Sequence, residues 1–151
     1  MTPDDMAALH AAAFKDERHW SAVEFADLLK SNHVDAYTQA HGMALTSTAG
    51  GDTELLMLAV HPDHRRRGIA RALTLQWLDS VGDRADIAFL EVAADNLAAL
   101  TLYTDLGFGI IGRRVAYYTR ESGPAVDALI MQQALPHGQG LDSIPFPPES
   151  S

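Results

Sequence analysis

Four of the chain's eleven Lys and Arg residues lie in the seven positions from Arg65 to Arg71, around Gly68. This cluster follows the apolar run Thr53–Val60 and precedes a stretch whose apolar residues have helical spacing. A turn that leads from a strand into a helix exposes backbone N–H groups, and the helix dipole adds partial positive charge. Arginine side chains add bidentate donors for phosphate. The segment therefore predicts a phosphate-binding turn, and a solvated basic loop that caps the helix is the alternative.

Other chemistry at this turn is less well supported by the sequence. The chain contains neither GxxxxGK[ST] nor GxGxxG, which argues against a P-loop nucleotide site and a dinucleotide-binding fold. His61 and His64 lie three residues apart, but no motif such as HExxH accompanies them, so we expect no metal.

The composition indicates a single soluble domain. The 151 residues are 47% hydrophobic, contain no cysteine and carry a formal net charge of −9. The acidic balance argues against direct binding of nucleic acid. It suits a basic partner, or it simply aids solubility. The sequence shows neither a signal peptide nor a membrane span, and we expect a cytoplasmic protein that does not contact a membrane.

Sequence patterns predict the elements that position the basic turn. Residues 4–14 are typical of a helix, and Ser21 with Glu24 matches a capping box that opens a second one. Two further helices are expected, one after Gly68 and one between Asn96 and Gly107. Strands are expected at 35–39, 42–48, 53–60, 87–92, 109–119 and 125–133, with turns at 49–52 and 121–124.

The order of these elements predicts an α/β domain over residues 1–135. The strands 53–60 and 87–92 are apolar enough to be buried on both faces, and the helix between them makes a βαβ unit. These two strands should be parallel, with a right-handed crossover. The Pro- and Gly-rich residues 136–151 are expected to form a disordered tail.

Two segments, "AVHPDHRRRGIARAL" and "FLEVAADNLAALTLYTDLGF", resemble the GCN5-related N-acetyltransferase superfamily. Its acetyl-CoA motif is matched by Arg65, Gly68 and Ala70. The Leu-Glu-Val strand end, the Asn five residues after the Glu and Leu-Tyr-x-x-Leu-Gly-Phe are most similar to the bacterial ribosomal-protein-alanine N-acetyltransferases. The similarity covers roughly residues 4 to 135.

This resemblance implies a mixed sheet that splays between its two central parallel strands, with acetyl-CoA in the opening. Pantetheine would pair with the first of these strands, and the pyrophosphate would rest on the amides of the turn. Asn96 would contact the arm of the cofactor, although its plainer role is a helix N-cap. The implied cofactor-binding residues are Leu58, Ala59, Val60, Arg66, Arg67, Gly68, Ile69, Ala70, Arg71 and Asn96.

Acetyl transfer to an amine requires a proton acceptor, a stabilised oxyanion and a proton donor for the departing thiolate. Glu91 is the expected base, a backbone N–H near Val60 the expected oxyanion donor, and Tyr103 the expected acid. Each side chain has a structural alternative. Glu91 could pair with an arginine at a strand end, and Tyr103 could be a core aromatic.

The resemblance implies direct transfer of an acetyl group to the α-amine at a protein N-terminus, with a ribosomal protein of the small subunit as the implied partner. A small amine or a lysine side chain is an alternative acceptor. A non-catalytic module that binds acetyl-CoA is the alternative from another functional class. The residues leave the oligomeric state open.

Overall fold

The computed structural model describes residues 1–120 and 123–136. The expected tail at 137–151 and part of the turn at 121–124 lie outside the described residues. Four helices accompany the strands in the described part: α1 (Pro3–Ala13), α2 (Ala22–Leu29), α3 (Ile69–Val81) and α4 (Leu97–Asp105). A short 3-10 turn, η1, spans Pro62–His64. None of the described helices is long and apolar enough to cross a membrane.

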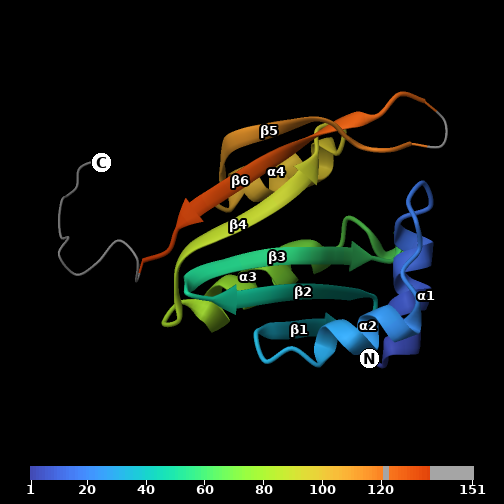
Figure 1. The fold of residues 1–151 in the computed structure, drawn as a ribbon, viewed down its shortest axis with the longest axis horizontal. Helices are drawn as coiled ribbons and strands as arrows, with labels where there is room; N and C mark the ends of the chain where they lie inside the picture. Colours follow the sequence, from blue (N-terminus) through green and yellow to red (C-terminus); the bar gives the residue numbers. More distant parts are fainter. Residues whose placement is uncertain (121–122, 137–151) are drawn as a thin grey trace.

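Six strands form one mixed sheet in the order β1-β2-β3-β4-β6-β5, which confirms the predicted α/β class (Figure 1). The sequence placed every strand correctly, and no predicted end differs from the observed one by more than two residues. The bounds are β1 (Val34–Gln39), β2 (Gly42–Ala49), β3 (Gly51–Val60), β4 (Ala85–Ala93), β5 (Gly109–Tyr118) and β6 (Val126–Ala134).

The central strands β3 and β4 are parallel, as predicted, but they pair over only part of their length. Their last partner pair is Leu55 and Leu90, although β3 continues to Val60 and β4 to Ala93. Beyond this pair the two strands part, as Figure 1 shows. The expected splay of the sheet is therefore present.

A β-bulge at Leu56 reverses the faces of β3 just where the strands part. Leu45 of β2 is opposite Met57, whereas the next residue of β2 is opposite Leu55, so Leu56 is the extra residue. Before the bulge, Leu55 faces the core formed with α3 and α4. After it, Ala59 faces a second core formed with α1 and α2. The two layers of helices thus lie on opposite faces of the sheet.

The prediction that these two strands are buried on both faces was wrong. Glu54 is exposed, Leu56 is 39% exposed, and Phe89 is only half-buried. The physical reason is that α3 and α4 cover one face of the sheet, whereas α1 and α2 cover only one end of the other. The remainder of that second face, over β3, β4 and β6, stays open.

A buried polar chain fixes α3 against β3. The indole Nε1 of Trp77 donates a hydrogen bond of 2.8 Å to Thr53 Oγ1, and the Thr53 and Thr48 hydroxyls lie 2.8 Å apart. All three side chains are buried, so each polar group needs its partner inside the protein. This arrangement holds the second half of α3 against the first half of β3.

Local signals fixed the helix ends as expected. Ser21 and Glu24 form a complete capping box at the start of α2. Gly107 follows α4 with φ 102°, and the N–H of Phe108 donates to the carbonyl of Tyr103 at 3.0 Å. Phe108 packs edge-on against the Tyr103 ring, which is the apolar contact predicted for this cap.

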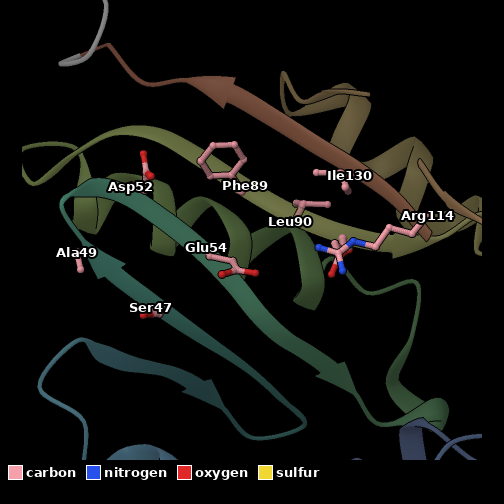
Figure 2. A pocket seen from close by; sticks show the side chains of 9 residues that line it. Ser47, Ala49, Asp52, Glu54, Phe89, Leu90, Arg114 and Ile130 are labelled. Carbon is pink, nitrogen blue, oxygen red and sulfur yellow. The ribbon is translucent and has the colours of Figure 1, made fainter. Parts of the chain in front are cut away.

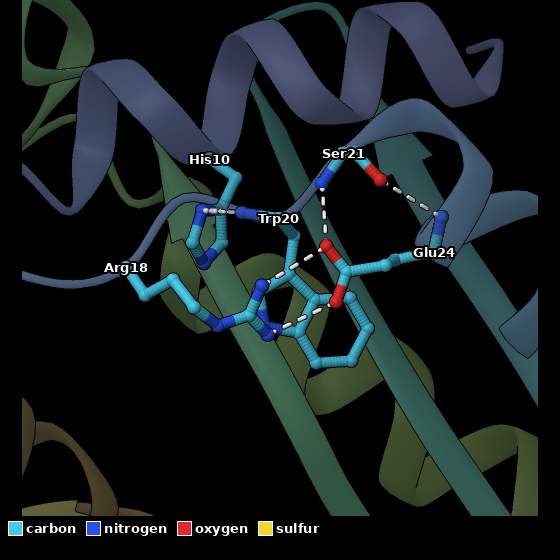
Figure 3. Close-up of polar contacts among 5 residues, drawn as sticks. All are labelled: His10, Arg18, Trp20, Ser21 and Glu24. Carbon is cyan, nitrogen blue, oxygen red and sulfur yellow. Dashed lines mark hydrogen bonds and ion pairs between the residues drawn. The ribbon is translucent and has the colours of Figure 1, made fainter.

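The loop between α1 and α2 is held by a small polar network (Figure 3). Arg18 donates two hydrogen bonds of 3.0 Å to the carboxylate of Glu24. His10, only 3% exposed, accepts a hydrogen bond at Nδ1 from the backbone N–H of Trp20. Burial lowers the pKa of His10, and the positive charges of His19 and Arg18 lower it further. The folded protein therefore favours the neutral form of His10.

This histidine should make stability fall at mildly acidic pH. Since its pKa is lower in the folded state, the unfolded chain binds more protons once the pH drops below about 6.5. We expect the free energy of urea unfolding to decrease from pH 7.5 to 5.5. In His10→Asn the amide oxygen can replace Nδ1 as acceptor, and the decrease in unfolding free energy should be smaller. The decrease that remains comes from His64, whose pKa is also lowered.

The exposed His33 provides the matched control, and His33→Asn should retain the wild-type pH dependence. An unchanged decrease in His10→Asn would contradict the role given to His10.

Candidate active site

The turn after β3 presents free backbone amides at the start of α3. Gly68 is the N-cap of α3 with φ 78°, in the left-handed region, and no side chain caps the helix there. Arg66 also has a positive φ, of 64°. A Cβ on Gly68 would meet no atom within 4 Å, so the space above the turn is open. The geometry fits a bound diphosphate, because the first amides of a helix attract anions.

The four arginines of this turn have different environments. Arg65 donates to the carbonyl of Ala13 at 3.0 Å and ties the turn to the end of α1. An Arg67 nitrogen lies 3.4 Å from Nδ1 of His64. Arg66 and Arg71 are exposed. At least one member of the cluster is therefore structural, which the sequence pattern did not distinguish.

Two histidines stack beside the turn. The rings of His41 and His64 are nearly parallel, with centroids 3.4 Å apart. His61 meets His64 edge-on at 5.8 Å and accepts from the N–H of Asp63. Within residues 1–120 and 123–136, no group of three or more His, Cys, Asp or Glu side chains could hold a metal ion.

The end of β3 offers a backbone edge. Leu58, Ala59 and Val60 have no partner on β4, because the ladder stops at Leu55 and Leu90. Buried backbone groups need hydrogen-bond partners, so this edge is suited to a ligand with amide groups of its own. The edge leads directly to the Gly68 turn.

Glu91 is the first residue of β4 beyond the last β3–β4 pair. Its side chain is 25% exposed and lies at a pocket of about 320 Å³ on the open face of the sheet (Figure 2). The pairings of Glu54 with Phe89 and of Glu91 with Ile130 place these side chains on one face. The pocket is lined by Ser47, Ala49, Asp52, Glu54, Phe89, Leu90, Glu91, Arg114 and Ile130.

Glu91 forms an ion pair with an arginine, the structural alternative raised by its place at a strand end. Oε2 of Glu91 lies 2.9 Å from Nε of Arg114 on β5. This oxygen is buried and makes no hydrogen bond of good geometry within the described residues, so the contact is one of charge. Burial and the negative charge of Glu91 raise the pKa of Tyr118 to about 12.

Tyr103 and Asn96 both occupy the structural roles that the sequence allowed. Tyr103 is 5% exposed and packs in the core beside Phe108, and burial raises the pKa of its hydroxyl above the usual value. A phenol in this state stays protonated and can donate. Asn96 caps α4 by accepting from the N–H of Ala99 at 3.2 Å, and within the described residues its amide NH₂ has no hydrogen-bond acceptor.

Among the residues that line the pocket, sequence reasoning named only Glu91 as a site residue, and it missed the other charged ones, Asp52, Glu54 and Arg114. Glu54 alternates with Thr53 and Leu55 on β3, and this polar residue in an apolar run was the available signal for an open face. Arg114 gave no signal, because its contact with Glu91 joins residues 23 positions apart across β6.

The model of the acetyltransferase (GNAT) family matches residues 4–108. The chain is 34% identical over 140 residues to the [ribosomal protein bS18]-alanine N-acetyltransferase of Escherichia coli K12, covering 89% of this chain and 93% of the relative. It is 35% identical over 136 residues to N-alpha-acetyltransferase RimI of Mycobacterium tuberculosis, covering 84% and 83%.

Solved structures of N-acetyltransferases share this fold. The crystal structure of the ribosomal-protein-S18-alanine N-acetyltransferase from Escherichia coli superposes with a TM-score of 0.79 at 29% identity, covering 88% of this chain and 87% of that one. Arabidopsis thaliana NAA60 with acetyl-CoA shares the fold, with a TM-score of 0.73 at 16% identity over 87% and 92%. The chain belongs to the acetyltransferase (GNAT) family and is an N-acetyltransferase that uses acetyl-CoA.

Proposed function

We propose that this enzyme acetylates the α-amine at the N-terminus of a protein, with N-terminal alanine of a ribosomal protein of the small subunit as acceptor. The observation that carries the proposal is the position of Glu91 at the fork of β3 and β4, with the pocket on one side and the free β3 edge on the other. The name of the Escherichia coli relative specifies alanine of a ribosomal protein, and the name of the Mycobacterium tuberculosis relative specifies an α-amine acceptor. A net charge of −9 also favours basic partners such as ribosomal proteins.

One group of residues binds the cofactor, and another carries out the chemistry. The amides of Arg66, Arg67, Gly68, Ile69, Ala70 and Arg71 hold the diphosphate. Leu58, Ala59 and Val60 pair with the pantetheine arm, and Asn96 donates to it. Acetyl-CoA, when bound, supplies the acetyl group as a thioester.

Glu91 accepts the proton of the acceptor amine, directly or through a water. A backbone N–H near Val60 donates to the acetyl carbonyl oxygen, and Tyr103 donates its proton to the departing sulfur. An α-amine has a reference pKa of about 7.7–8.0 against about 10.4 for lysine, so it loses its proton more readily at neutral pH. The carboxylate of Glu91, whose side chain is 25% exposed, can receive that proton from the pocket side.

The acceptor is tested with three peptides and a thiol-release assay. One peptide has a free N-terminal alanine and no lysine, the second is the same peptide with a blocked N-terminus, and the third is blocked but contains one lysine. We expect acetyl-CoA-dependent thiol release with the first alone. Equal release with the first and second would refute α-amine specificity, and release with the third would favour a lysine acceptor.

Glu91→Gln tests the base. Because the amide cannot accept a proton, we expect turnover to fall by roughly 100-fold or more, while the affinity for coenzyme A measured by calorimetry stays nearly unchanged. Undiminished turnover in this variant would remove Glu91 from the mechanism.

Gly68→Glu tests whether the amides of the Gly68 turn bind the diphosphate. A carboxylate above the free amides repels phosphate, and we expect coenzyme A to bind roughly tenfold or more weakly in calorimetry. Gly50→Glu is the matched control, since Gly50 also has a positive φ, of 61°, and no atom within 4 Å of an added Cβ. The two variants share the added charge and the backbone strain. Equal affinities of the two variants for coenzyme A would therefore rule out a diphosphate site at the Gly68 turn.

A further inference from the structure

The ion pair between Arg114 and Glu91 spans three strands of the sheet. Glu91 on β4 is opposite Ile130 on β6, which is opposite Gly112 on β5. Arg114 lies two residues beyond Gly112 and reaches back over β6 to the carboxylate. A glycine on this face leaves room for the long side chain, since even a Cβ there would lie 3.4 Å from Ile130 Cδ1.

The pair is held loosely on the arginine side. Arg114 is 54% exposed, and its guanidinium carbon lies 5.2 Å from the centroid of the Tyr117 ring, which it faces. The contact with Glu91 lacks a well-aligned hydrogen bond. Partly exposed pairs of this kind are weak, so the guanidinium can be exchanged for another cation.

The pair is not needed to join the strands. Backbone ladders already connect β4 to β6 and β6 to β5 along most of their lengths. Arg113, the neighbour of Arg114, makes its own ion pair with Asp127. Asp127 also accepts from the N–H of Ala116 at 2.8 Å, which fixes the irregular end of β5. Arg114 therefore has a role other than strand pairing.

The position of the guanidinium defines that role. It lies in the pocket that adjoins Glu91, together with Glu54 and Asp52, for which no ion pair is present among the described residues (Figure 2). An amine acceptor enters this pocket as a cation, because an α-amine is largely protonated near neutral pH. Two cations cannot occupy the same place against one carboxylate oxygen without repulsion.

We propose that Arg114 is a positioning residue that takes the place of the acceptor's ammonium in the free enzyme. It keeps the Glu91 carboxylate directed into the pocket and swings away over Tyr117 when the acceptor binds. The inference rests on the proposed acceptor pocket and on Glu91 as the base. It makes the affinity for the acceptor a competition between an internal and an external cation.

Arg114→Gln, with Arg113→Gln as control, tests this competition. With the alanine peptide as acceptor, we expect the KM for the peptide to fall roughly two- to fivefold in Arg114→Gln, the effect of displacing one partly exposed ion pair. The kcat should stay within about twofold, because the arginine has left before the proton moves. Arg113→Gln should match the wild type. An unchanged or higher peptide KM in Arg114→Gln would overturn the proposal, as would a loss of kcat.

A second measurement does not depend on acetyl transfer. Methylammonium chloride, added to the ¹⁵N-labelled wild type, should shift the Nε–H signal of Arg114 saturably, with potassium chloride as the ionic-strength control. The signal of Arg113 should not move. If no peptide is acetylated but Arg114 responds, the proposed acceptor is wrong and the exchangeable pair is right. If Arg114 does not respond, the pair is not exchangeable and the inference fails.

Discussion

The end of the β3–β4 ladder at Leu55 and Leu90 is the constraint on which the rest of the site depends. Two parallel strands that part leave backbone groups without partners on facing edges, and such groups require a ligand or water. The same divergence leaves Glu91 at the fork, open on one side. The bulge at Leu56 allows β3 to pack against both layers of helices, since it turns Ala59 toward α1 and α2. The proposed cofactor-binding edge and the proposed acceptor pocket thus have one structural origin.

Two electrostatic environments lie on either side of this fork. On the turn at Gly68, free amides and exposed arginines make a positive site within a chain of net charge −9. On the open face, the described residues that line the pocket include Asp52, Glu54 and Glu91 together with Arg114. An anionic acetyl donor and a cationic amine acceptor are attracted to different places. The separation lets both reach the fork without competing for the same charges.

Some of this was accessible from the sequence because its causes are local. The capping box of Ser21 and Glu24, the left-handed Gly107 and the Gly68 turn each depend on a few neighbouring residues. The open face was missed, because apolar content alone suggested burial of both sides of β3 and β4. Whether a face is covered depends on how far α1 and α2 extend over the sheet, and Glu54 was the signal within β3 that pointed to an open face.

By itself, the sequence determined the elements, their order and the family, because periodicity, caps and motif spacing are short-range properties of the chain. It also determined that Glu91 lies at the end of a strand and that Gly68 precedes a helix. Only the tertiary structure decided which charges meet. The pairing of Glu91 with Arg114, and of Arg65 with the end of α1, joins residues 23 and 52 positions apart. Such contacts follow from sheet order and packing, which bring distant residues together after the local elements have formed.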